Sequence, residues 1–152
     1  MKNDDHISPE LVRYGTQVTS ADVHALGQFV LQRTRSALKD ASAGSVAGQM
    51  ALGLQMTVKT LTGQLTAYLA VAADPESAWN RLARMLVIDS AWNLLLDAAH
   101  PWTHHPTYDK ERWQRTKLKE SLVMAQIDAA TAGDKQALEW LEALWKSIEQ
   151  PA

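Results

Sequence analysis

The segment SVAGQMALGLQMTVKTLTGQLTAYLAVAA, Ser45 to Ala73, contains a single charged residue, Lys59. Apolar residues recur in it at alternating spacings of four and three, which is the repeat of one face of an α-helix. The residues of this face are Ala47, Ala51, Leu54, Val58, Leu61, Leu65, Tyr68 and Ala72. Low charge on every side is typical of a buried helix. The stretch therefore predicts a long central helix over about residues 45–73, with other helices packed around it.

Polar residues along this stretch exclude a membrane span. They are Gln49, Gln55, Thr57, Lys59, Thr60, Thr62, Gln64 and Thr66. Because a spanning helix needs about 20 predominantly apolar residues, we expect no membrane association. Three glycines in the stretch each cost up to about 1 kcal/mol relative to alanine, which favours close contact with a neighbouring helix. Where the domain leaves the helix uncovered, we expect a two-fold dimer interface.

Helix start and stop signals divide the rest of the chain into further helices. Prolines preceded by serine or aspartate mark two starts, and Gly133-Asp134 separates the last two helices. The expected helices are a short one from Pro9 to Gly15, then 20–40, 75–99, 109–130 and 135–149. In the last of these we expect an apolar stripe to face the core. Its residues are Leu138, Leu141, Leu144, Trp145 and Ile148.

Alternating strand patterns are missing from the sequence, so the expected fold is all-α. A chain of 152 residues with 46% hydrophobic content has the size of one domain with one core. We predict a single-domain bundle of five main helices plus a short N-terminal helix. The domain is expected to span residues 8–150, preceded by a mobile N-terminal tail, residues 1–7.

Composition removes several classes of function. The formal net charge is -2 and cysteine is absent, so no long-range field favours nucleic acid, and disulfides and thiolate catalysis are excluded. The charged N-terminus lacks the apolar run of a secretory signal, so we expect a cytoplasmic protein. Neither G-x-S-x-G nor a phosphate-binding glycine loop occurs in the sequence. We therefore expect no catalytic residues, no cofactor and no enzymatic activity.

The residues best suited to chemistry by type lie in and beside the loop HPWTHHPTY, residues 100–108. The candidate metal ligands are His100, His104, His105 and Asp109, whose side chains suit zinc or a similar ion. Two of the histidines precede proline, so their spacing is not that of a specific helical metal site. A polar loop anchored by Trp102 and Tyr108 is the simpler interpretation. We predict no metal site and keep a metal-binding bundle as an alternative.

Basic residues gather in DKERWQRTKLKE, residues 109–120. They are Lys110, Arg112, Arg115, Lys117 and Lys119. A helix over this segment would place Arg112, Arg115 and Lys119 on one face, where they could contact phosphates. A nucleic-acid-associated subunit is therefore an alternative function. The acidic residues of the segment and the slightly acidic chain favour a solvated outer face instead.

Six tryptophans against one phenylalanine direct attention to protein contacts, because tryptophan is favoured at the centres of interfaces. Trp140 lies beside the apolar stripe of the last helix and Trp102 lies in a loop. We expect these two to contact a partner, with packing at the edge of the core as the alternative for each. The predicted function is non-enzymatic: a helical adaptor, inhibitor or oligomer subunit that binds another protein or a second copy of itself.

Overall fold

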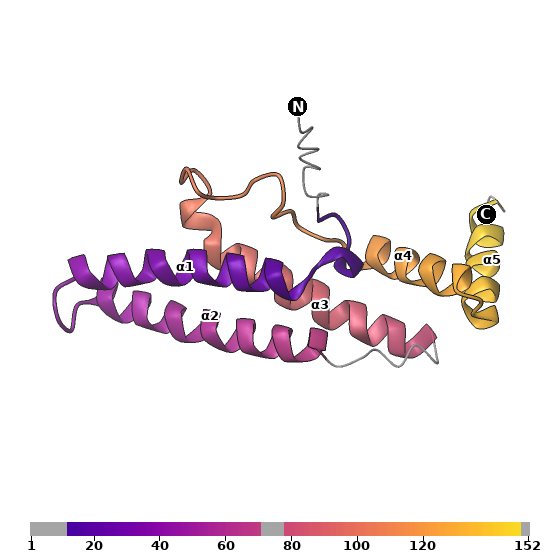
Figure 1. Cartoon of the computed structure of the whole chain (residues 1–152), viewed down its shortest axis with the longest axis horizontal. Coiled ribbons are helices and arrows are strands. Elements are labelled where there is room, and N and C mark those ends of the chain that lie inside the picture. The colour runs from indigo at the N-terminus through magenta and orange to yellow at the C-terminus, as the bar shows by residue number, and fades with distance from the viewer. Residues whose placement is uncertain (1–11, 71–77, 150–152) are drawn as a thin grey trace, which may run out of the picture.

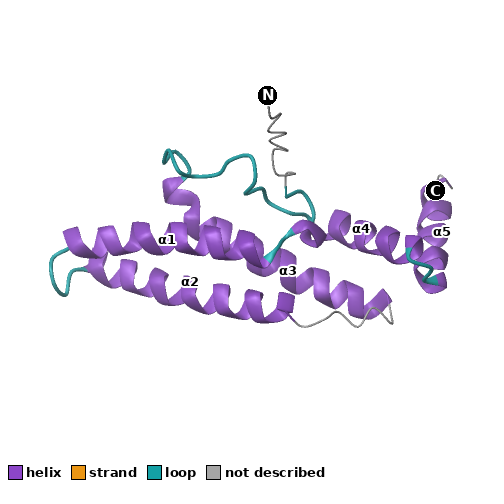
Figure 2. Ribbon diagram, in the orientation of Figure 1, coloured by secondary structure: helices purple, strands orange, loops and turns teal. Residues whose placement is uncertain are grey.

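The structure of the protein, a computed structural model, describes residues 12–70 and 78–149. Its elements in chain order are the 3-10 turn η1 (Gly15–Gln17), the helices α1 (Ser20–Asp40), α2 (Val46–Ala70) and α3 (Ala78–Ala99), the 3-10 turn η2 (His100–Trp102), and the helices α4 (Leu118–Thr131) and α5 (Lys135–Glu149). No strand occurs in these ranges (Figure 2). The predicted all-α domain with five main helices is confirmed.

Some predictions fall outside the described residues. These are the tail 1–7, the start of the short N-terminal helix at Pro9, the end of the central helix at 71–73 and the start of the next helix at Pro75. Within the described residues, the prediction of a short helix ending at Gly15 is wrong, because residues 12–14 are not helical and the 3-10 turn η1 begins only at Gly15.

The helices form a three-helix body with a two-helix extension. α1 and α2 run antiparallel along their length, and α3 packs against both (Figure 1). α4 packs against α3 and α5, whereas α5 contacts α4 extensively and α3 only slightly. The α4–α5 pair therefore extends from one end of the body (Figure 1). None of the described helices is long and apolar enough to cross a lipid bilayer.

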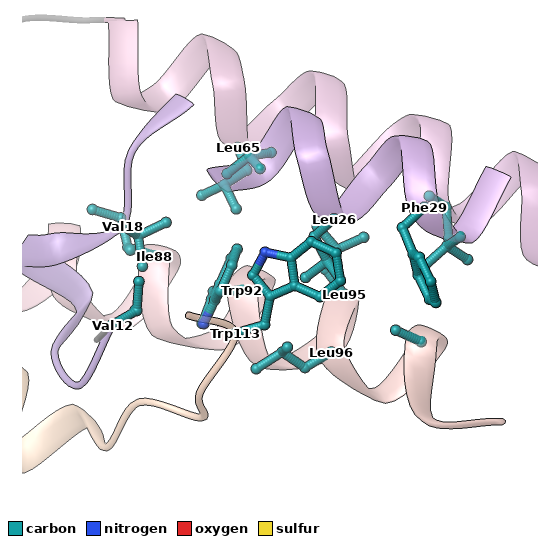
Figure 3. Close-up of a cluster of buried hydrophobic side chains, with 14 of the residues drawn as sticks. Val12, Val18, Leu26, Phe29, Leu65, Ile88, Trp92, Leu95, Leu96 and Trp113 are labelled. Atoms are coloured by element: carbon teal, nitrogen blue, oxygen red, sulfur yellow. The ribbon is translucent and has the colours of Figure 1, made fainter. Parts of the chain in front are cut away.

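The core lies between α1 and α3, with α2 on one side (Figure 3). Its members from α1 and α3 are Val23, Leu26, Phe29, Val30, Leu31, Met85, Ile88, Trp92, Leu95, Leu96 and Ala99. The buried residues of α2 are Ala51, Val58 and Leu65, spaced seven apart. They belong to the face that the four-and-three spacing predicted. This periodicity therefore identified the correct packing side of α2.

A reciprocal hydrogen-bond pair fixes the start of α1. The Asp22 N–H donates to Thr19 Oγ1 at 3.2 Å, and the Thr19 N–H donates to Asp22 Oδ2 at 2.9 Å, which is a capping box. Arg112 also binds this carboxylate, because its Nε and Nη2 each donate to one Asp22 oxygen at 2.7 Å. The start of α1 is thus held both locally and by the loop before α4.

The helix predicted to follow the histidine loop begins at Leu118, later than expected. Side chains of α3 bind the backbone that a longer helix would have used for its own hydrogen bonds. Trp92 Nε1 donates to the Gln114 carbonyl at 2.8 Å, and Asn93 exchanges two hydrogen bonds with the backbone of Thr116. The segment before Leu118 is therefore a loop tied to α3, and the prediction of a helix there is wrong.

Aromatic rings fix the same loop to α1. The ring of Trp113, which is buried, lies 5.4 Å from that of Phe29 and 5.1 Å from that of Tyr108. Edge-to-face and tilted contacts at this separation stabilise packing beyond the area they bury. These ring contacts hold the loop against the core. They favour the observed loop conformation over a helix at this position.

A buried polar cluster joins four segments near η1. Asp89 Oδ1 accepts hydrogen bonds from Thr116 Oγ1 at 2.8 Å and from Ser121 Oγ at 3.0 Å. Ser121 Oγ in turn accepts from the Gly15 N–H at 2.8 Å. Burial raises the pKa of Asp89, an effect that the two hydroxyl donors oppose. A Cβ at Gly15 would lie 2.5 Å from Asp89 Oδ1, so this close approach requires glycine.

Candidate interaction surface

A tight turn sets α5 against α4. Gly133 has a φ of 101°, a left-handed conformation that glycine adopts without strain. Asp134 caps α5 by accepting from the Ala137 N–H at 3.1 Å, and it also accepts from Arg81 of α3 at 2.8 Å. The bond from Ala137 and the Arg81 guanidinium hold the pKa of Asp134 below its usual value. The first turn of α5 is therefore anchored, and the helix leads away from this anchor.

The apolar face of α5 is left uncovered. Leu138, Trp145 and Ile148 are 50%, 63% and 68% exposed, and Ala137 is the buried residue of this helix. The prediction that the face packs into the core is wrong for these three residues. The physical reason is that α5 packs mainly against α4 and only slightly against α3, and one main neighbour cannot cover a wide apolar stripe.

The two helices enclose an apolar groove between them. The groove has a volume of about 660 Å³ and is lined by Val123, Ile127, Leu141, Leu144, Trp145 and Ile148, together with the charged residues Lys119, Glu142, Lys146 and Glu149. We call this surface the α4–α5 groove. Six of the ten lining residues are apolar and four are charged, and concave apolar surfaces of this kind are candidate binding sites.

The indole N–H of Trp145 has an acceptor within its own helix. Its Nε1 donates to Glu149 Oε1 at 2.7 Å, one helical turn away. Because the indole N–H already has an acceptor in its own chain, covering the ring leaves no donor unpaired. The ring therefore presents apolar area whose burial carries no hydrogen-bond cost.

A second uncovered surface runs along the outer side of α2. Its exposed side chains include the apolar Val46, Met50, Leu52 and Met56 and the polar Gln49, Thr57, Lys59, Thr60, Gln64 and Thr66. The prediction that α2 is buried on all sides is wrong, because α1 and α3 cover one side only. Although Lys59 is the one charged residue on α2, the exposed threonine and glutamine side chains of this face form hydrogen bonds with water. It is a weaker candidate for docking than the α4–α5 groove.

The tryptophans chosen from the sequence occupy intermediate positions. Trp102 is half-buried and packs against the core, and Trp140 is half-buried on α5. The prediction that these two contact a partner stays a prediction. Trp145 is the more exposed tryptophan of α5, and its place in the same stripe as Leu141 and Leu144 led us to assign it to the core.

The basic residues do not form the predicted helical stripe. Lys110, Arg112, Arg115 and Lys117 precede α4, and Lys119 lies on its first turn. Arg112 binds Asp22, Arg115 pairs with Asp97, and Lys117 lies 3.7 Å from Glu120. The geometric basis of the nucleic-acid alternative is therefore wrong, whereas nucleic-acid binding itself stays a prediction.

The histidine loop is organised by contacts within the chain. His105 Nε2 contacts Arg33, and its Nδ1 accepts from the Thr107 N–H at 3.2 Å. Asp109 accepts from the Arg112 N–H at 2.9 Å, while His100 and His104 are exposed. Within residues 12–70 and 78–149, no three histidine, aspartate or glutamate side chains are placed to share a metal ion. The metal-binding alternative therefore has no ligand set in this part of the chain.

Comparisons with known protein families, with curated proteins and with solved structures gave no match to this chain. The functional interpretation accordingly depends on the geometry of the surface itself. Val123 and Ile127, spaced four apart on α4, complete a groove that sequence reasoning missed. Their spacing of four places both on one face of α4. It identifies them as groove residues only once α4 and α5 are known to pack against each other.

Proposed function

We propose that the protein is a non-enzymatic binding protein whose α4–α5 groove receives an apolar surface of another protein chain. The observation that carries this proposal is the combination of a groove of about 660 Å³ with the exposed side chains of Trp145 and Ile148 beside it. The hydrophobic effect favours covering such area by about 25 cal/mol for each Å² removed from water. The expected cytoplasmic location belongs to the same proposal.

The contrast between the two ends of the fold supports this assignment. In the three-helix body, hydroxyl and carboxylate groups are joined to one another, as Asp89, Thr116 and Ser121 show, and their role there is structural. In the α4–α5 pair, six of the ten residues that line the groove are leucine, isoleucine, valine or tryptophan. Aromatic and aliphatic residues of this kind supply the central contacts of protein interfaces.

Photo-crosslinking tests the proposal without knowledge of the partner. A benzophenone-bearing amino acid in place of Trp145 is expected to give crosslinked protein adducts in an extract of the source cells. The matched control carries the same group in place of Ala143, which is exposed on the other side of α5. The readout is the mass of the adducts on a denaturing gel and by mass spectrometry.

The proposal predicts adducts from position 145 that are absent or much weaker from position 143. Equal labelling from both positions would indicate random collision and contradict a specific groove. The absence of any adduct from position 145, while the purified variant retains the helical content of the parent, would overturn the proposal.

A further inference from the structure

We propose that the occupant of the α4–α5 groove is a second copy of this chain, so that two α4–α5 pairs join into a four-helix assembly. This inference depends on the proposed function and specifies its partner. A two-fold axis lets each copy offer the same patch to the other, which is the commonest arrangement among oligomers. Three features favour a second copy as the occupant: the charges of the groove, the register of α5 and the intrahelical hydrogen bond of Trp145.

The charges that line the groove are balanced. The groove is lined by two basic residues, Lys119 and Lys146, and by two acidic residues, Glu142 and Glu149. A strongly acidic or basic partner would meet two like charges, whereas a second copy brings the same mixture and can match each sign with its opposite. Complementary potentials of this kind determine register and partner choice.

The register of α5 allows these charges to match. Glu142 and Lys146 are one helical turn apart and lie on one edge of the apolar face. In an antiparallel pair, the same edge of each helix meets its equivalent. When two α5 helices pair around Leu144, Glu142 of each copy lies opposite Lys146 of the other. The symmetry therefore produces two equivalent ion pairs beside the apolar contact.

The apolar side chains of α5 also fit the antiparallel pairing of two copies. Leu141 and Leu144 are partly exposed within one chain, and Ile148 is 68% exposed. Trp145 already donates its N–H to Glu149, so the indole ring requires no acceptor from the other copy. An identical apolar surface can cover these side chains, while the charged residues at the edge of the face pair with those of the other copy.

The area of the α4–α5 face determines how tightly two copies are expected to associate. α4 and α5 contain 14 and 15 residues, so the two-helix face is about 21 Å long and about 20 Å wide. Such a face is at the lower end of specific interfaces, which bury roughly 800 Å² on each partner. We therefore expect a reversible monomer–dimer equilibrium whose dimer fraction rises with protein concentration.

Charge exchange on α5 tests the pairing directly. Glu142→Lys alone and Lys146→Glu alone each place like charges opposite each other twice, and each is expected to weaken self-association roughly tenfold. An equimolar mixture of the two variants restores opposite charges at both contacts and is expected to associate as tightly as the parent. The double variant Glu142→Lys/Lys146→Glu is also expected to associate like the parent. Sedimentation velocity over a concentration series gives the dissociation constants.

Two apolar variants locate the contact. Ile148→Glu is expected to weaken self-association at least about a hundredfold, whereas Met50→Glu on the outer side of α2 is expected to leave it unchanged. Both side chains are largely exposed, and a thermal melt of each variant confirms that the fold is retained. Loss of association with Met50→Glu instead would place the interface on α2 and overturn the inference.

The remaining outcomes separate this inference from the proposed function. A parent chain that stays monomeric at every concentration, while position 145 crosslinks to a protein of different mass, would refute the second copy and leave the groove as a binding site. A monomer without any crosslink at position 145 would refute both. Single charge variants that associate as well as the parent, or a mixture no tighter than either variant, would overturn the antiparallel pairing.

Discussion

Replacing Arg112 with alanine is expected to lower the free energy of unfolding by about 3–5 kcal/mol. The guanidinium binds both oxygens of Asp22 at 2.7 Å, and the two side chains are 15% and 9% exposed. Removing the cation leaves a largely buried carboxylate without its main partner, and the loop before α4 loses its link to α1. Urea unfolding followed by circular dichroism measures the change.

Arg115→Ala is the matched control for this prediction. Arg115 pairs with Asp97, but the two side chains are 62% and 55% exposed, and solvent-exposed ion pairs contribute at most about 1 kcal/mol. A similar loss of stability for both arginine variants would contradict the assignment of Arg112 to structure. If Arg112→Ala weakened the binding of a ligand, its loss of stability would have to be measured first, before Arg112 could be assigned as a ligand contact.

The effect of Arg112→Ala is also expected to depend on pH. Burial by itself would raise the pKa of Asp22, but hydrogen bonds from Arg112 and Thr19 outweigh burial and place the pKa below its usual value. A carboxyl with a lowered folded-state pKa adds stability above its unfolded value of about 3.9 and loses it as the pH falls through the folded value. The difference between parent and variant should therefore be constant near neutral pH and shrink below about pH 4.

Replacing Trp92 with alanine is expected to cost a similar amount, about 3–5 kcal/mol. Its side chain is fully buried at the centre of the core (Figure 3), and its Nε1 holds the Gln114 carbonyl at 2.8 Å. The substitution both opens a cavity and releases the loop from α3. Thermal and urea unfolding measure the loss.

Trp92→Phe separates the two contributions of this side chain. It keeps most of the ring and removes the donor to Gln114, so the expected cost is only about 1–3 kcal/mol. Equal costs for the alanine and phenylalanine variants would mean that the hydrogen bond, and not the packing, dominates. Negligible cost for both would contradict the placement of Trp92 in the core.

Helical periodicity predicted the packing side of α2 well, because Ala51, Val58 and Leu65 are buried where the four-and-three spacing placed them. The same reasoning failed on the opposite side of α2. This side of α2 has few charged residues, but threonine and glutamine side chains form hydrogen bonds with water. A helix face can therefore be solvent-exposed without carrying many charges. The inference from low charge to complete burial was therefore too strong.

The candidate site could not be predicted from α5 alone. An apolar stripe such as Leu141, Trp145 and Ile148 looks the same whether it faces a core or a partner, because both environments exclude water. What decides between them is the number of neighbouring helices. The sequence before Leu118 looked helical, yet its backbone is bound by Trp92 and Asn93, a long-range effect that local patterns do not contain.

Amide hydrogen exchange across α5, measured at low and high protein concentration, reports whether α5 is covered when two copies associate. If the α4–α5 groove is the surface through which this chain binds a second copy, exchange of the α5 amides should slow as concentration rises, while exchange in α2 stays constant. Exchange in α5 that is independent of concentration, or slowing confined to α2, would contradict the account.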